Sequence, residues 1–144
     1  MDDDPYSPRP VARWYGIAAI GSLLFMLLGC AVYLMSVTTD PASLPLDQRA
    51  AREAQPLWVV SANAIAVWSG ALGALLLVLR RRLAETVLLG SVIAVAAWLA
   101  GLLLVPKLRE ALGTADFVVA IVVSLLTWTI YWFARHSRQR GWLR

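Results

Sequence analysis

The chain carries four long apolar runs that are separated by short polar segments. The runs cover residues 14–37, 57–79, 83–105 and 117–134, and Glu85 is the only charged residue in the two central runs. At a helical rise of about 1.5 Å per residue, each central run reaches about 34 Å, slightly more than the hydrocarbon core of a bilayer. Each of the four runs is therefore predicted to be a membrane-spanning helix.

Arg80, Arg81 and Arg82 are the whole connection between the two central runs. So short a connection forces the second helix to turn back along the first. Adjacent cations tend to stay on the cytoplasmic side of a membrane, so the turn and both chain termini are predicted to be cytoplasmic. The sequence thus predicts an all-α fold, a polytopic bundle of four antiparallel transmembrane helices.

The distribution of the other cations agrees with this orientation. The outer segments hold Arg49, Arg52, Lys107 and Arg109, whereas more than twice as many cations fall on the inner side. Arg135 follows three aromatic residues at the end of the last run, which is typical of a membrane interface. The inner cations are Arg9, Arg13, Arg80, Arg81, Arg82, Arg135, Arg138, Arg140 and Arg144.

Composition supports a membrane protein. Hydrophobic residues make up 60% of the chain and the mean hydropathy is +0.67, which is too apolar for a soluble domain of this size. The net charge of +4 comes from cations at helix ends, where they can meet lipid headgroups, so the expected partners are membrane lipids and not nucleic acid. A single cysteine and no Cys/His cluster give no reason to expect a disulfide, a metal or a cofactor.

The segments outside the four runs are polar. Residues 1–13 are acidic and then proline-rich, which predicts a disordered cytoplasmic tail before a transmembrane domain at 14–134. Residues 135–144 are expected to form a basic cytoplasmic tail. The longest connection, residues 38–56, contains good helix formers at 46–54, which indicate a short helix on the membrane surface.

Small residues recur along the two central runs at helical spacing. Helices in lipid pack closely where small side chains let their backbones approach, so these stripes are predicted to be buried faces of the bundle. The alternative is that alanine and glycine are simply common in membrane helices. The stripes are Ala62, Ala66, Gly70 and Ala74 in the second run, and Gly90, Ala94, Ala97 and Gly101 in the third.

Four side chains, one from each run, form the candidate ligand site: Tyr33, Asn63, Trp98 and Ser124. At helical rise each lies roughly 6 to 11 Å below the outer surface. The amide of Asn63 needs a polar partner in hydrocarbon. If the four converge, they form a hydrated cup suited to a neutral, polyhydroxylated ligand; alternatively, Asn63 joins two helices while the aromatic residues face lipid headgroups.

Charged groups are absent from the middle of every predicted span, which argues against an ion-coupled pump. Glu85 lies in the first turn of the third run, four residues after Arg81, and we expect the helix dipole and this pair to stabilise its carboxylate. The sequence offers no nucleophile with a base, no acid/base pair and no metal set, so an enzyme is not expected.

Cys30 and the residues before it partly resemble the lipobox of bacterial lipoproteins. The segment that follows Cys30 stays apolar through Met35, and Leu28 fits its position poorly. Retention of the first span is therefore favoured over cleavage and lipidation.

Seven short runs lie in the first two spans, in the connection between them and in the arginine turn: Leu27-Leu28-Gly29-Cys30, Tyr33-Leu34-Met35, Leu46-Asp47-Gln48-Arg49-Ala50, Trp58-Val59-Val60, Ala66-Val67-Trp68-Ser69-Gly70, Leu75-Leu76-Leu77 and Arg80-Arg81-Arg82. Together they resemble a group of small four-span inner-membrane proteins of proteobacteria that are commonly labelled sugar transporters. The resemblance implies a bacterial inner-membrane protein that moves a small neutral polar solute, and it brings no established binding residues.

Two functional interpretations remain open. A transporter needs a polar path, and the four helices carry few polar residues within the spans. They can therefore provide such a path only if the protein forms a homo-oligomer. The other interpretation is a non-enzymatic accessory or structural subunit of a larger membrane complex, which needs only well-packed helices.

Overall fold

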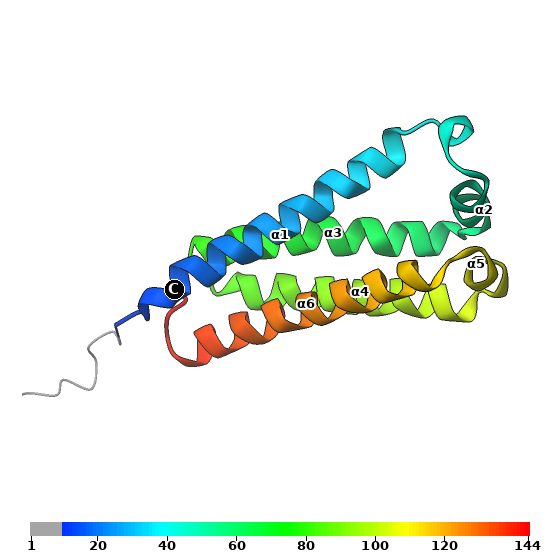
Figure 1. The fold of residues 1–144 in the computed structure, drawn as a ribbon. Helices are drawn as coiled ribbons and strands as arrows, with labels where there is room; N and C mark the ends of the chain where they lie inside the picture. Colours follow the sequence, from blue (N-terminus) through cyan, green and yellow to red (C-terminus); the bar gives the residue numbers. More distant parts are fainter. Residues whose placement is uncertain (1–9) are drawn as a thin grey trace, which may run out of the picture.

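A computed structural model describes residues 10–144, and most of the predicted disordered tail, residues 1–9, lies outside the described residues. The described part is helical and contains no strand. Its elements are α1 (Arg13–Thr38), the 3-10 helix η1 (Pro41–Ser43), α2 (Leu46–Ala54), α3 (Leu57–Val78), α4 (Leu83–Leu104), α5 (Pro106–Ala111) and α6 (Thr114–Gln139) (Figure 1).

The four long helices α1, α3, α4 and α6 are each long and apolar enough to cross a membrane. The chain is therefore a multi-pass membrane protein, and the predicted all-α fold with four spanning helices is confirmed. The short helix predicted at residues 46–54 is α2.

The helices pack in the order α1, α3, α4, α6, so α1 and α6 are the outer members of the bundle. Figure 1 shows the start of α1, the end of α6 and the α3–α4 turn at one end of the bundle, which we name the turn end. At the other end, here the α2/α5 end, α1 diverges from the remaining helices, and η1, α2 and α5 lie across the bundle.

Two glycines of α3 set how closely the neighbouring helices approach it. A Cβ atom built on Gly73 would lie 2.6 Å from Cγ of Leu88 on α4. A Cβ atom on Gly70 would lie 2.7 Å from the sulfur of Met26 on α1 and 3.0 Å from Oγ of Ser91 on α4. A side chain at Gly73 would press on both the side chain and the backbone of Leu88, so α4 would have to move, whereas at Gly70 the flexible Met26 side chain can give way more easily.

The predicted small-residue stripe of α3 lies along this contact. Ala66, Gly70 and Ala74 are buried and Ala62 is half-buried. Gly73, which the four-residue spacing did not include, is buried as well.

The stripe predicted on α4 is only partly placed at the interface. Ala94 and Gly101 are buried, and Gly101 packs against Val59 of α3, whereas Ala97 is half-buried. Gly90 is exposed, and a Cβ atom built there would meet nothing within 4 Å. The expectation for Gly90 was wrong because the buried face of α4 passes through the next residue, Ser91.

Ser91 is fully buried and joins the two central helices. Its Oγ donates a hydrogen bond to the carbonyl of Ala66, 2.8 Å away. A hydroxyl beside a small residue can approach a neighbouring backbone closely, which is one of the recurrent ways in which membrane helices are held together.

The last helix is longer than the span predicted at residues 117–134, since α6 continues to Gln139. It ends where Gly141 adopts a left-handed conformation with φ of 73°. The N–H groups of Gly141 and Trp142 donate to the carbonyls of Arg138 and Ser137, each over 3.0 Å, which is the Schellman pattern of a helix end. Residues 135–144 therefore continue the helix and then fold back on the bundle.

The glycine contacts predict that Gly73→Leu lowers the thermal unfolding midpoint of the purified protein in detergent by several degrees. Forcing a side chain into this contact costs about 1–3 kcal/mol, since α3 and α4 must separate. Gly90→Leu is the matched control, because its side chain enters open space, and we expect its midpoint to stay close to that of the unchanged protein. Equal midpoints for the two variants would contradict the observed helix contact.

Candidate functional site

The turn end of the bundle is held closed by contacts between α1, the α3–α4 turn and the chain after α6. The Tyr15 hydroxyl donates to the carbonyl of Leu77 over 2.6 Å, and the Arg80 guanidinium lies 5.6 Å from the Tyr15 ring centre. The backbone of Arg144 pairs with the turn on both sides, because its N–H donates to Arg80 and its carbonyl accepts from Arg82.

An aromatic cluster fills the same end. The ring centre of Tyr15 lies 5.4 Å from that of Phe133 and 5.8 Å from that of Trp142. Trp14 contacts both Phe133 and Trp142, and His136 contacts Trp142. Because Tyr15, Phe133 and Trp142 are buried, these three rings pack α1 against the end of α6 and the chain that follows it.

Glu85 takes a different partner from the one expected. Its carboxylate accepts from the Arg138 guanidinium at 2.7 Å, and not from Arg81 on the preceding turn. The pair joins the first turn of α4 to the last turns of α6, which the sequence could not indicate because the partners are 53 positions apart.

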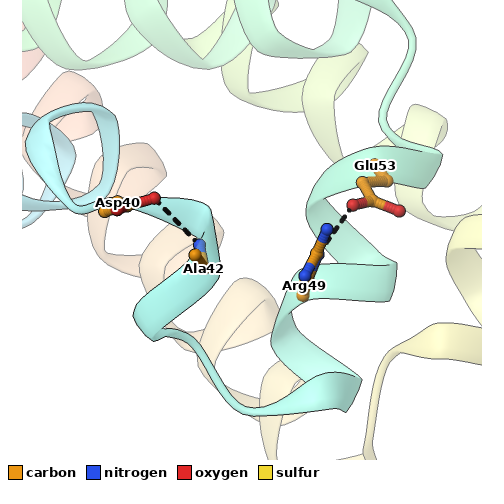
Figure 2. A network of polar contacts seen from close by, with 4 residues as sticks. All are labelled: Asp40, Ala42, Arg49 and Glu53. Atoms are coloured by element: carbon orange, nitrogen blue, oxygen red, sulfur yellow. Dashed lines mark hydrogen bonds and ion pairs between the residues drawn. The ribbon is translucent and has the colours of Figure 1, made fainter.

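At the α2/α5 end, the polar connection is ordered by its own hydrogen bonds. The Asp40 carboxylate accepts from the N–H of Ala42 at 2.9 Å and thereby begins η1, and Arg49 pairs with Glu53 along α2, also at 2.9 Å (Figure 2). The guanidinium of Arg52 donates to the carbonyl of Thr39 over 3.0 Å and to that of Ser36, so α2 is tied to the end of α1.

The same end has a small apolar core of its own. Ala51 of α2 and Leu108 of α5 are buried with Val59 and Leu102 of the central helices. Since α2 packs on α5 and is tied to α1, it bridges the two sides of the bundle where α1 and α6 diverge.

A large cavity lies inside the α2/α5 half of the bundle. It has a volume of about 1210 Å³ and is lined by residues of all six α-helices and of the segments next to α2 and α5. Tyr33 of α1, Asn63 of α3 and Trp98 of α4 all line it, so the structure brings three of the four predicted ligand residues to one cavity.

Ser124 is the predicted residue that does not join the others. Its Oγ donates to the carbonyl of Ala120 in its own helix over 2.7 Å, and it is not among the lining residues. The face of α6 that lines the cavity carries Thr127 instead, whose Oγ1 donates to Val123 in the same way. Thr127 lies three residues deeper, at about 15 Å from the predicted start of the span, which is outside the depth used for the prediction. Depth alone could not indicate which face of α6 lines the cavity.

The lining changes in character along the cavity. Its charged members are Asp47 and Arg52 of α2, Glu110 of α5 and Asp116 in the first turn of α6, all at the α2/α5 end. Its parts within the spans are neutral, with Tyr33 and Asn63 among mostly apolar side chains. The cavity can therefore hydrogen-bond and stack on a neutral ligand at membrane depth, and it presents charge only at its outer rim.

Cys30 lies inside the uninterrupted helix α1 and is buried against α3, with its sulfur 3.8 Å from the carbonyl of Val67. Within residues 10–144 no group of three His, Cys, Asp or Glu side chains is placed to hold a metal ion.

Comparisons with protein-family models, with curated proteins and with solved structures find no match to this chain.

The closed turn end predicts that Trp142→Ala destabilises the protein much more than Trp128→Ala. Both changes remove an indole, but Trp142 is 8% exposed in the aromatic cluster, whereas Trp128 is 59% exposed on the outer face of α6. Removing a buried tryptophan costs about 3–5 kcal/mol. Thermal unfolding in one detergent compares the two variants, and similar midpoints would contradict the packing of the chain end on the bundle.

Proposed function

We propose that this membrane protein binds a small neutral polar solute, sugar-like in its chemistry, in the cavity lined by Tyr33, Asn63 and Trp98, and takes part in moving it across the membrane. The observation that carries the proposal is that these three side chains come from three different helices and line one cavity. The resemblance to proteins labelled sugar transporters agrees with it.

The lining chemistry favours a neutral ligand. An amide both donates and accepts hydrogen bonds, a phenol does the same, and an indole offers an apolar face and one donor. Hydroxyl groups of a sugar fit this combination, whereas a charged ligand would find no opposite charge in the parts of the cavity within the spans. At about 1210 Å³ the cavity is larger than the usual 300–1,000 Å³ of ligand pockets, so a sugar unit fits with water around it.

Passage across the membrane requires more than this cavity, because the turn end is closed by Tyr15, Phe133 and Trp142. We propose that the protein works as a homo-oligomer in which contacts between copies open or complete the path. We further propose a bacterial inner-membrane location with the Arg80–Arg82 turn in the cytoplasm, since three adjacent cations favour that side. The cavity then faces the outer half of the membrane.

The same closed end supports a second candidate function. A bundle with one packed end could serve as a non-enzymatic accessory subunit of a larger complex, in which the cavity holds a ligand without passing it on. Purification in mild detergent followed by identification of co-purifying proteins separates the two functions. A different protein that co-purifies in a fixed ratio favours the accessory role, whereas an oligomer that contains only copies of this chain favours transport.

The proposed site predicts that Asn63→Leu weakens binding of neutral sugars at least tenfold. Losing the amide removes hydrogen bonds worth about 1–1.5 kcal/mol each. Saturation-transfer NMR with glucose and maltose, on protein in lipid nanodiscs, measures the effect. Ser69→Ala is the control, because Ser69 is on the same helix, is not a lining residue and bonds to its own helix. Absence of any sugar signal, or the same signal for both variants, would contradict the proposal.

The proposed orientation predicts which sites an impermeant maleimide reaches. In a Cys30→Ser background, Ser43→Cys in η1 is expected to react in intact spheroplasts, whereas Gln139→Cys at the end of α6 is expected to react only after permeabilisation. Both positions are exposed, so accessibility to solvent does not distinguish them. The opposite labelling pattern would place the arginine turn outside and overturn the orientation.

A further inference from the structure

The cavity is open sideways, between α1 and α6. These two helices meet at the aromatic cluster of the turn end and diverge toward the α2/α5 end (Figure 1). Several large apolar residues that line the cavity are also half or more exposed, among them Val32 at 59%, Met35 at 68% and Val119 at 60%. Because these residues lie on spanning helices, the opening faces the lipid and not the water.

A second hollow lies between the same two helices, nearer the turn end. It measures about 400 Å³ and is lined by residues that include Ala18 and Ser22 of α1 and Thr129 and Ile130 of α6. The seam between α1 and α6 is therefore hollow at two places along its length. The two hollows are separate, and each leaves space for part of an apolar chain between α1 and α6.

Polarity falls along the cavity from the α2/α5 end toward the middle of the bundle. Charged residues stand at its rim, and Tyr33 and Asn63 follow about one to two helical turns inside the helix ends. The deepest lining residues include Met26 and Val95, and the hydroxyl of Thr127 at this depth is already bonded to its own helix. A molecule with a polar head and an apolar chain matches this order, with its head under α2 and its chain along the seam.

The rim charge limits which head can bind. Asp47, Glu110 and Asp116 carry three carboxylates, and Arg52 carries the one guanidinium among the lining residues. Arg52 already donates to the carbonyls of Ser36 and Thr39, so its hydrogen bonds serve the contact between α2 and α1. Among residues 10–144, neither Asp47 nor Glu110 forms an ion pair. The rim is therefore acidic, which disfavours an anionic headgroup.

From these observations we infer that the ligand is an amphiphile, a neutral sugar-like head on an apolar lipid chain, which enters sideways from the lipid through the seam between α1 and α6. This inference rests on the proposed function, because it takes the same cavity and names the class of its substrate. The head lies beside Asn63, Tyr33 and Trp98. It enters past Val32 and Val119, which lie at a similar depth, and the chain runs deeper along the seam past Met26.

A second copy of the chain is the main competing occupant of the seam. A helix of another copy could cover the exposed mouth. It would not fill the deeper part of the cavity, where Asn63 of α3 and Trp98 of α4 lie. A lipid fills both parts because its head and its chain have different shapes and polarities.

The test compares three probes on protein in phosphatidylcholine nanodiscs: monoglucosyl diacylglycerol, free glucose and phosphatidylglycerol. Native mass spectrometry and competition titration measure occupancy. We expect the glycolipid to bind at least tenfold more tightly than either glucose or phosphatidylglycerol. Val32→Trp, which narrows the mouth of the seam, should reduce glycolipid binding at least tenfold. Leu34→Trp is the control, because Leu34 lies on α1 and is exposed but is not a lining residue.

The outcomes separate this inference from the proposed function. If glucose binds as tightly as the glycolipid, and Val32→Trp changes neither, the sideways entry is wrong while sugar binding stands. If phosphatidylglycerol binds as tightly as the glycolipid and Asn63→Leu does not change glycolipid binding, both the preference for a neutral headgroup and the proposed sugar site are contradicted. If crosslinks between Val32→Cys and Val119→Cys copies, in a Cys30→Ser background, form in high yield and exclude the glycolipid, a second copy covers the seam and the inference is overturned.

Discussion

The close contact between α3 and α4 is the interaction on which the rest of the bundle depends. In a bilayer there is no hydrophobic driving force between apolar side chains, because lipid tails are equally apolar. Helices therefore associate through close packing and interhelical hydrogen bonds. Gly73 against Leu88 and the bond from Ser91 to Ala66 supply both. The other two spanning helices then dock on this pair, α1 on α3 and α6 on α4.

The two ends of the bundle differ in how α1 and α6 meet. At the turn end, Tyr15, Phe133 and Trp142 fill the space between them, and the returning chain adds backbone hydrogen bonds to the arginine turn. At the other end, α1 diverges from the bundle, and Arg52 of α2 donates hydrogen bonds to the carbonyls of Ser36 and Thr39 at the end of α1. The cavity exists because the helices are pinned together at one end and spread at the other by a bridging helix.

The candidate site illustrates how far depth along a helix can be read without a structure. Tyr33, Asn63 and Trp98 each lie at a similar distance from an outer helix end, and they line one cavity. Ser124 satisfies the same criterion but faces elsewhere on α6, where Thr127 takes the lining position. Depth follows from counting residues, whereas direction around the helix depends on which neighbour that helix packs against.

The sequence by itself determined the class of protein, the number of spanning helices and the short helix at residues 46–54, because apolar length and charge position are local properties of the chain. Only the tertiary structure decided that Gly90 is exposed while Gly73 is buried, that Glu85 pairs with Arg138, and that the chain after α6 returns to the arginine turn. Each of these depends on the rotation of one helix against another. That rotation is fixed by contacts between residues far apart in the chain. The periodicity within a single helix carries no information about such contacts.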